Sequence, residues 1–288
     1  MNKKTDIKTL FIKGLRFFVF LLAISSLWSC SKEYDLTIVE TTMFEGGDIS
    51  AFAANAAWET TFIKSDNPRV ELKYSKCLEK GVIANLNNGK LDLGLSLSTF
   101  VPTGASMIAT VYTDKINDIS LNYGSTAEFD GKFQASTLNI RLVQASSCRK
   151  FDIAVEGDCS ISLDGSSVLS DYNISCTSAT IAASNTSHIA GILAPTNKLE
   201  VELKNSSRFV NYQSAPASIK AKLETASLMN ITQTLTQNLD IEMSASEASV
   251  KVNGTITGRL SNASTLYYTG NANISLLEVE EGSKVETF

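Results

Sequence analysis

The sequence predicts an all-β protein folded as a parallel β-helix, or β-solenoid, with coils of about 20 residues. Three observations support this prediction. A motif of apolar, any, apolar, any, any, small and Ser recurs from residue 119 onward. Its two apolar positions are two residues apart, so both side chains lie on one face of a strand. Four columns of residues keep register through nine copies, which favours stacked coils over a chance pattern.

The amino terminus has the pattern of an export signal. Basic residues at positions 3, 4, 8, 13 and 16 precede an apolar run from Phe17 to Ile24, which Ser25, Ser26, Leu27 and Trp28 extend. This is a positive n-region followed by an h-region. The run is too short to span a bilayer as a helix.

The end of this signal, Leu27-Trp28-Ser29-Cys30, resembles the bacterial lipobox, in which a small residue precedes a cysteine that is lipidated and becomes the new first residue. We therefore predict lipidation of Cys30; an ordinary secretory signal with a chance cysteine is the alternative. The following Ser31–Asp35 resembles the surface-export signal of Bacteroidetes lipoproteins, or is a solvated tether. The predicted location is the outer membrane, on its periplasmic or cell-surface side, where the lipid tethers the protein to the membrane without a membrane-spanning segment.

The part of the chain before the repeats also has the pattern of strands. Residues 91–95 alternate apolar and polar, as do residues 108–112, and Asn87-Asn88-Gly89 is a turn signal between apolar stretches. No Pro-, Gly- or Ser-rich linker separates this part from the repeats. It is therefore expected to be continuous with them.

The repeats consist of four columns. The second apolar position falls on Leu121, Leu142, Leu163, Ala183, Leu203, Leu223, Met243, Leu260 and Val279. The first stands two residues earlier, at Ile119, Ile140, Ile161, Ile181, Val201, Ala221, Ile241, Gly258 and Leu277. Small residues follow at Gly124, Ala145, Ser166, Thr186, Ser206, Ala226, Ser246, Ala263 and Gly282. The next position is Ser in eight of nine copies, with Glu247 as the exception.

Identical residues in register favour parallel stacking, because an antiparallel meander needs no such identity. Each coil is expected to lie about 4.8 Å above the previous one, and eight steps give a rod of roughly 40 Å. The apolar columns then become internal ladders, and the small column marks a tight corner. The serines can bond to one another and to the turn backbone.

The sequence also resembles a known family. The residues that carry the resemblance are Gly81–Leu86, Gly89–Leu93, Asp118-Ile119 and the small-Ser steps Gly124-Ser125, Gly165-Ser166-Ser167, Ser206-Ser207 and Gly282-Ser283. Together they look like the head GIN domain of putative auto-transporter adhesins, over nearly all of residues 44–288. The resemblance implies a right-handed parallel β-helix (solenoid) and an adhesin-like role, and it implies no catalytic residues.

The predicted organisation has three parts. Residues 1–29 are a lipoprotein signal peptide, residues 30–43 a tether and first strand, and residues 44–288 a head GIN-like domain. Within this domain, residues 44–118 form the N-terminal β part and residues 119–288 the regular repeats.

Composition and charge exclude several classes of function. With 43% hydrophobic and 19% charged residues, the chain has a globular composition. Its single histidine, His188, excludes multi-histidine metal sites and leaves little room for histidine-dependent catalysis, so we expect it to be exposed or packed at an edge. The 25 basic and 30 acidic residues give no basis for nucleic-acid binding. No metal site and no cofactor is predicted.

Four cysteines follow Cys30, namely Cys77, Cys148, Cys159 and Cys176. Their spacings match no zinc or redox motif. Export permits disulfides, but we favour small buried core residues.

Three classes of function remain. The first is a non-catalytic surface or periplasmic module for adhesion or recognition of carbohydrate or another cell-surface ligand, with Tyr212, Tyr267 and Tyr268 as edge aromatics that could equally be structural. The second is a polysaccharide lyase or hydrolase that uses the carboxylates of Asp152, Glu156, Asp158 and Asp164, for which a solvated acidic face is the alternative. The third is a passive envelope scaffold. We favour the first; the sequence indicates neither the ligand nor the oligomeric state.

Overall fold

The structure is a computed structural model that describes residues 34–288. Its contacts divide the chain into two units, Met1–Asp35 and Leu36–Phe288. The signal peptide (1–29) and the predicted lipidation site, Cys30, lie outside the described residues. The second unit is built of strands, with one short 3-10 helix, η1 (Lys76–Leu78).

The strands follow one another along the chain as β1 (Ile38–Met43), β2 (Ala51–Ala54), β3 (Glu59–Lys64), β4 (Arg69–Ser75), β5 (Val82–Asn87), β6 (Lys90–Leu95), β7 (Met107–Thr113), β8 (Asp118–Leu121), β9 (Thr126–Asp130), β10 (Lys132–Ala135), β11 (Leu138–Leu142), β12 (Ser147–Val155), β13 (Asp158–Leu163), β14 (Val168–Ala183), β15 (His188–Leu203), β16 (Arg208–Asn211), β17 (Ser218–Glu224), β18 (Leu228–Ser244), β19 (Glu247–Ser261), β20 (Thr265–Thr269), β21 (Asn273–Val279) and β22 (Lys284–Thr287).

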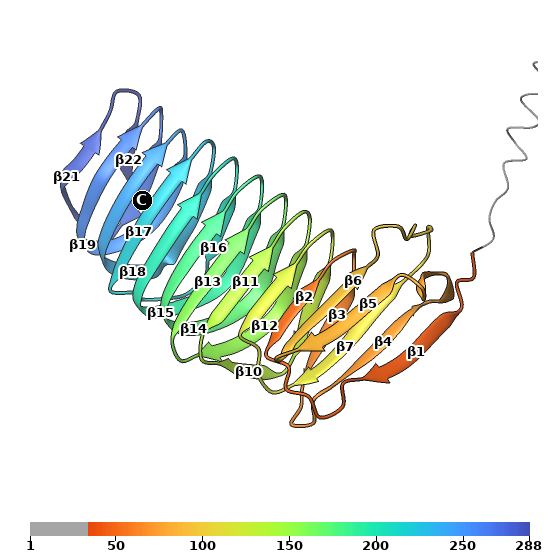
Figure 1. Ribbon diagram of the computed structural model, residues 1–288. Coiled ribbons are helices and arrows are strands. Elements are labelled where there is room, and N and C mark those ends of the chain that lie inside the picture. The colour runs from red at the N-terminus through yellow and green to blue at the C-terminus, as the bar shows by residue number, and fades with distance from the viewer. Residues whose placement is uncertain (1–33) are drawn as a thin grey trace, which may run out of the picture. The chain divides into compact units, whose positions relative to one another are not determined.

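These strands stack as the coils of a parallel solenoid (Figure 1). One side, which we call face A, runs β6-β2-β8-β11-β13 and continues through the C-terminal parts of β14 and β15, then β17, the C-terminal parts of β18 and β19, and β21. A second side, face B, runs from β7 through β3, β9, β12 and the N-terminal parts of the long strands to β20 and β22. Every pairing within these two stacks is parallel, which confirms the predicted fold class.

The register of face A is the one that the repeats predict. Ile140 pairs with Ile119 on one side and Ile161 on the other, and the leucine column pairs in the same way. From Leu121 to Leu260 the second apolar column is buried, and even the short side chain of Ala183 is only 3% exposed. The two columns are therefore internal ladders, as expected.

The core is continuous along the whole unit, but its composition changes. In the first coils phenylalanines fill it: Phe62 stacks on Phe129 with ring centroids 4.6 Å apart, and Phe52, Phe133 and Phe151 meet this pair edge-on. In later coils Ile, Leu and Met take over. The column ends at the last coil, where Val279 keeps the register with Leu260 but is 47% exposed, so the prediction that the column is internal is wrong at this position.

The small column forms the corner between faces A and B. Most of its residues, and the residue before each, have positive φ, as in Asn205 (54°) and Ser206 (63°). Two successive residues in this conformation make a tight turn that disfavours β-branched and bulky side chains. The serine that follows is buried and donates its hydroxyl to the carbonyl three residues earlier, as Ser207 does to Lys204 at 2.7 Å. The serines thus bond to the turn backbone.

The exception at Glu247 arises from a shorter turn. After Met243 only three residues precede the next strand, whereas four do so in most other coils. Ser246 is therefore the buried serine of this coil, and Glu247 is the exposed first residue of β19, paired with Leu228. The sequence columns place Ser246 in the small column and Glu247 in the serine column, whereas in the structure Ala245 and Ser246 occupy these two positions.

The first coils end in antiparallel strands. β5 pairs with β6 as a hairpin through Asn88 and Gly89, both with positive φ, which confirms the predicted turn. β4 pairs with β7 and β1 with β4, both antiparallel. The outermost parallel strands, β6 and β7, are therefore both covered by antiparallel strands, β5 and β4.

All four cysteines of the described part are free thiols, and Cys148, Cys159 and Cys176 are buried in the core, as predicted. Burial raises the pKa of the Cys148 thiol. None of the described residues forms a helix long and apolar enough to cross a bilayer.

Candidate binding surface

From β13 onward the outward side of face A has two contrasting halves. After Asp158 at the start of β13, the outward residues of β13 and of the C-terminal part of β14 are small and uncharged: Ser160, Ser162, Thr180 and Ala182. From β15 onward they are mostly charged. Because outward residues of successive coils stack in columns about 4.8 Å apart, each half presents a flat, regular surface.

The charged half alternates in sign from coil to coil. One outward column consists, by register, of Glu202, Lys222, Glu242, Arg259 and Glu278. Opposite charges in directly paired positions stabilise neighbouring strands modestly. This column therefore gives the surface a regular pattern of charge.

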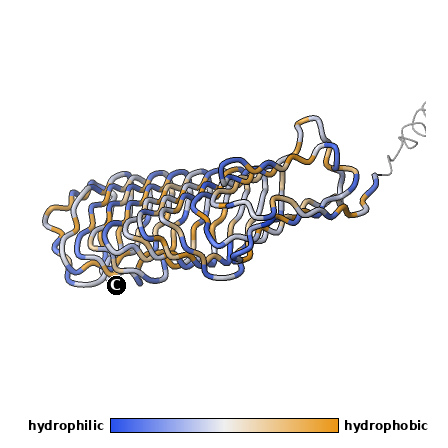
Figure 2. The backbone as a smooth tube through the Cα atoms, turned by 60° about the horizontal axis from the view of Figure 1, so that its bottom comes forward, coloured by the Kyte–Doolittle hydropathy of each residue, from blue (hydrophilic) through white to orange (hydrophobic). Residues whose placement is uncertain are grey.

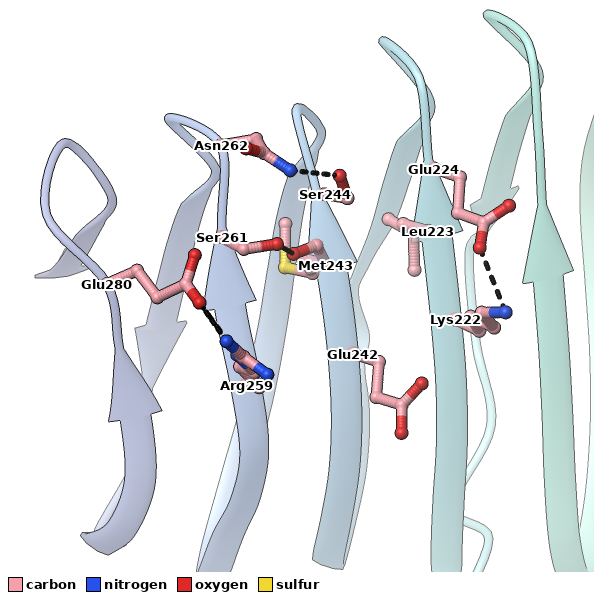
Figure 3. A pocket seen from close by; sticks show the side chains of 10 residues that line it. All are labelled: Lys222, Leu223, Glu224, Glu242, Met243, Ser244, Arg259, Ser261, Asn262 and Glu280. Atoms are coloured by element: carbon pink, nitrogen blue, oxygen red, sulfur yellow. Dashed lines mark hydrogen bonds and ion pairs between the residues drawn. The ribbon is translucent and has the colours of Figure 1, made fainter.

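A cavity of ≈ 450 Å³ opens on this half, where β17, β18, β19 and β21 lie side by side (Figure 3). It is lined by Lys222, Leu223, Glu224, Glu242, Met243, Ser244, Arg259, Ser261, Asn262 and Glu280. It lies where the stack becomes irregular: Leu239 pairs with Ile256, a step of 17 residues, instead of the 20 between Leu199 and Ile219.

Two ion pairs flank the cavity. Lys222 Nζ lies 2.9 Å from Glu224 Oε1, and this hydrogen bond lowers the pKa of the Glu224 carboxyl and raises that of Lys222. On the other side Arg259 Nε donates to Glu280 Oε1 at 2.9 Å, which raises the pKa of Arg259. Lys222, Glu224 and Arg259 are therefore held charged near neutral pH.

The carboxylate of Glu242 lies between these two ion pairs. Within residues 34–288, Glu242 makes no hydrogen bond or ion pair, and its side chain is exposed between the Lys222–Glu224 and Arg259–Glu280 pairs (Figure 3). Nearby, Asn262 Nδ2 donates to Ser244 Oγ at 2.8 Å. The cavity thus offers an acceptor, an amide and two hydroxyls to a ligand.

The cavity groups can bind a polar ligand. The cavity is open and contains no histidine or cysteine. No three metal-binding side chains come together anywhere in the described part of the chain. Charged and polar side chains on a flat surface can bind a ligand rich in hydroxyl groups through many weak hydrogen bonds.

Comparison with known proteins shows the family of this chain. The family model described as "Putative auto-transporter adhesin, head GIN domain" matches residues 50–272. The chain belongs to this family. The predicted resemblance is therefore confirmed. A comparison with curated proteins gives no match.

Solved structures share the fold of this head GIN domain. A putative adhesin from Parabacteroides merdae ATCC 43184 superposes with a TM-score of 0.59 at 12% identity, over 88% of this chain and 96% of that one. From Parabacteroides distasonis ATCC 8503, a putative lipid binding protein gives 0.56 and a putative adhesin 0.51, each at 9% identity over 88% of this chain and 98% of the other.

The tyrosines expected at the edges do not form one site. Tyr212 is exposed just after β16. Tyr267 lies on β20, which is three coils further along face B, and Tyr268 packs partly against the core. No aromatic platform for sugar rings results from these three residues.

Two of the four carboxylates proposed for hydrolysis are far apart in the head GIN domain. Asp158 and Asp164 lie at opposite ends of β13, roughly 20 Å apart for six extended residues. Paired glycosidase carboxylates lie about 5 to 9.5 Å apart. Asp152 accepts a hydrogen bond from Asn173, and Glu156 lines a different cavity with Lys64, Asp66 and Lys115. These positions fit the alternative of a solvated acidic face.

His188 is the half-buried first residue of β15 and pairs with Arg208 of the next coil. Burial, and then the charge of Arg208, lower the pKa of its imidazole.

Sequence reasoning missed the cavity residues Glu242, Arg259 and Asn262. Two features of the sequence could have indicated this surface: the alternating charges at one position of the repeat, and the short step of 17 residues from Met243 to Leu260.

Proposed function

We propose that this protein is an exported, lipid-anchored, non-catalytic head GIN domain that recognises a carbohydrate on a cell surface. The observation that carries this proposal is the outward side of face A, where Glu242, which makes no ion pair within residues 34–288, and the polar groups of the cavity lie together at the point where the coil step shortens. Membership of an adhesin family supports a role in attachment.

Carbohydrate is the ligand class that best fits these groups. Sugar hydroxyls both donate and accept hydrogen bonds, so they match a carboxylate, an amide and hydroxyls that line one cavity. The regular spacing of the coils also suits a repeating polymer, because equivalent contacts recur along the stack. Many such weak contacts add up when several copies bind one surface.

The binding test compares two carboxylates of face A. We expect the protein to bind members of a glycan array, and the double variant Glu242→Ala/Asn262→Ala to lose that binding. Glu200→Ala is the matched control, since Glu200 is also outward on face A but pairs with Lys198 outside the cavity. Equal loss in both variants, or no binding of any glycan or whole cell, would refute recognition and favour a scaffold.

The non-catalytic part of the proposal has its own test. The protein is incubated with a panel of polysaccharides, with and without calcium, and the products are examined for new reducing ends and unsaturated sugars. We expect none. Turnover that disappears in Asp158→Asn would establish a polysaccharide lyase or hydrolase instead.

The anchor rests on the lipobox-like Leu27–Cys30. Mass spectrometry of the protein from cell membranes should find an N-terminal Cys30 carrying acyl chains, and Cys30→Ser should prevent this processing. A mature chain that begins elsewhere and carries no lipid would refute the anchor.

A further inference from the structure

The loop that joins β6 to β7, residues 96–106, has an unusual surface. Leu97 is 107% exposed, Phe100 69% and Val101 43%. The loop contains no charged residue. Large apolar side chains gathered on an uncharged surface segment mark a contact with another apolar phase.

This loop lies beside the first residues of β1. β4 pairs antiparallel with both β1 and β7. β1 and β7 therefore run in the same direction, and their first residues lie at the same end of these strands. Ser75 joins them: Ile38 pairs with it, and its amide and hydroxyl bond to Ser106 at the base of the loop, both at 3.0 Å. Leu36, itself 41% exposed, approaches Gly104: its Cδ1 lies 3.6 Å from where a Cβ of that glycine would be.

The distance from the anchor limits where this loop can be. Leu36 follows Cys30 by six residue steps, and a fully extended chain spans at most about 3.6 Å per step, or about 21 Å in all. If Cys30 carries the lipid, Leu36 cannot lie further than this from the bilayer surface, and the loop adjoins Leu36 at Gly104. The net charge of the whole chain is −5, so charge attraction to anionic lipid does not explain such a contact.

From this arrangement we propose that loop 96–106, with Leu36, is a membrane-contact surface whose Leu97, Phe100 and Val101 side chains insert into the lipid interface. The proposal rests on the anchor of the proposed function. The contact orients the solenoid: its first coils rest on the bilayer, and β21, ten coil steps or about 48 Å further along face A, is held away from the bilayer surface. Figure 2 shows apolar segments of the tube in the first coils, near β1.

The test uses an added tryptophan as a depth probe. The chain from Cys30 onward, which contains the whole core of the unit Leu36–Phe288, is coupled through the Cys30 thiol to a maleimide lipid in vesicles of phosphatidylethanolamine and phosphatidylglycerol with brominated acyl chains. Half-buried Cys77 is replaced by Ser to prevent coupling there. Buried Trp58 supplies a constant background.

We expect bromine to quench the emission of Phe100→Trp and vesicles to shift its maximum to shorter wavelength. Leu276→Trp is the matched control, because Leu276 is 67% exposed on β21, and its emission should not change. Adding Leu97→Asp to Phe100→Trp should remove most of the quenching. Equal quenching in the two tryptophan variants, no quenching in either, or no effect of Leu97→Asp would overturn the proposal.

Chemical coupling makes this outcome independent of lipidation in the cell. The mass of the mature N-terminus decides the anchor, and the quenching decides the loop. A lipidated protein without quenching at residue 100 refutes the membrane contact alone. An unlipidated mature chain refutes the anchor, and with it the inference that this contact forms in the cell, whatever the quenching shows.

Discussion

The regular coils and the last coils of the solenoid follow the same repeat with different results. Between β8 and β18 both apolar columns are complete and buried. The first column fails in β19, where Gly258 has no side chain, and both columns fail in β21, where Leu277 is only partly buried and Val279 is 47% exposed.

The difference teaches that burial in this fold comes from neighbouring coils and not from the residue itself. An internal coil is covered on both sides, whereas β21 pairs within the described residues with β19 alone. The candidate binding cavity lies at the boundary between the two regions, where the step shortens to 17 residues. Regularity thus builds the scaffold, and the departure from it shapes the surface.

The largest expected effect compares two residues of one column. Leu203→Ala should lower the free energy of unfolding by about 2 to 5 kcal/mol, because Leu203 is fully buried in a middle coil. Val279→Ala removes a half-exposed side chain and should cost less than about 1 kcal/mol. Urea unfolding measures both. Similar losses would contradict the dependence of burial on neighbouring coils.

Gly258 sharpens the comparison at the point where the column breaks. Its φ is +117°, and an added Cβ would lie 2.1 Å from the carbonyl oxygen of Ile241. Gly258→Ala should therefore destabilise the protein by about 1 to 3 kcal/mol, because the backbone of β18 or β19 must move.

Gly124→Ala is the control for the positive φ itself. Gly124 has a φ of +72° and nothing within 4 Å of an added Cβ, and other coils carry Ala145 and Ala226 at the same turn position. Its cost should be about 1 kcal/mol or less. If the two glycine variants unfold at the same urea concentration, the predicted clash between a Cβ at residue 258 and the Ile241 carbonyl is contradicted.

The serine column predicts a smaller effect in the regular region. Ser207 is buried and donates to the Lys204 carbonyl at 2.7 Å, so Ser207→Ala should cost about 0.5 to 1.5 kcal/mol by leaving that oxygen without its donor. The exposed neighbour Ser206 provides the control, since Ser206→Ala should change stability by less than about 0.5 kcal/mol. Thermal unfolding of the pair distinguishes a structural hydroxyl from a tolerated small residue.

The smallest effect is one of pH, at Asp164. Hydrogen bonds from the Ser184 hydroxyl and the Asn185 amide, both 2.7 Å, lower the pKa of this carboxyl. A lowered pKa adds stability above the ordinary pKa of aspartate, and this contribution is lost as the pH falls through the folded-state value. Asp164→Asn should therefore cost less than about 1 kcal/mol at neutral pH. The difference between wild type and variant should disappear in strong acid; a difference that persists there would contradict this assignment.

The sequence contained most of the scaffold. Residues such as Ile140 and Leu203 stack on near-identical neighbours, so their spacing alone predicts the coil length, the inward face and the turn position. The assignment failed at Ser246 and Glu247, because a one-residue deletion in a turn looks the same as a substitution when only the strand columns are aligned. It failed again at Val279, since nothing in the local sequence marks a coil that lacks a neighbour.

The surface was much less accessible to prediction. The cavity at Glu242 depends on the register between coils, and the antiparallel covering of β6 and β7 depends on strand order, which alternation does not encode. The acidic candidates Asp158 and Asp164 are close in sequence, but an extended strand places them far apart. Proximity along the chain was therefore a poor guide to the site.

The stacking itself can be measured most directly by distances between spin labels in one outward column. Ser120, Glu202 and Glu242 occupy equivalent positions, with four coil steps between the first two and six between the first and last. With labels at cysteines introduced there, in a Cys77→Ser background, the distance from residue 120 should be about 19 Å to residue 202 and about 29 Å to residue 242. Two distances that do not differ by about 10 Å would contradict the parallel stack.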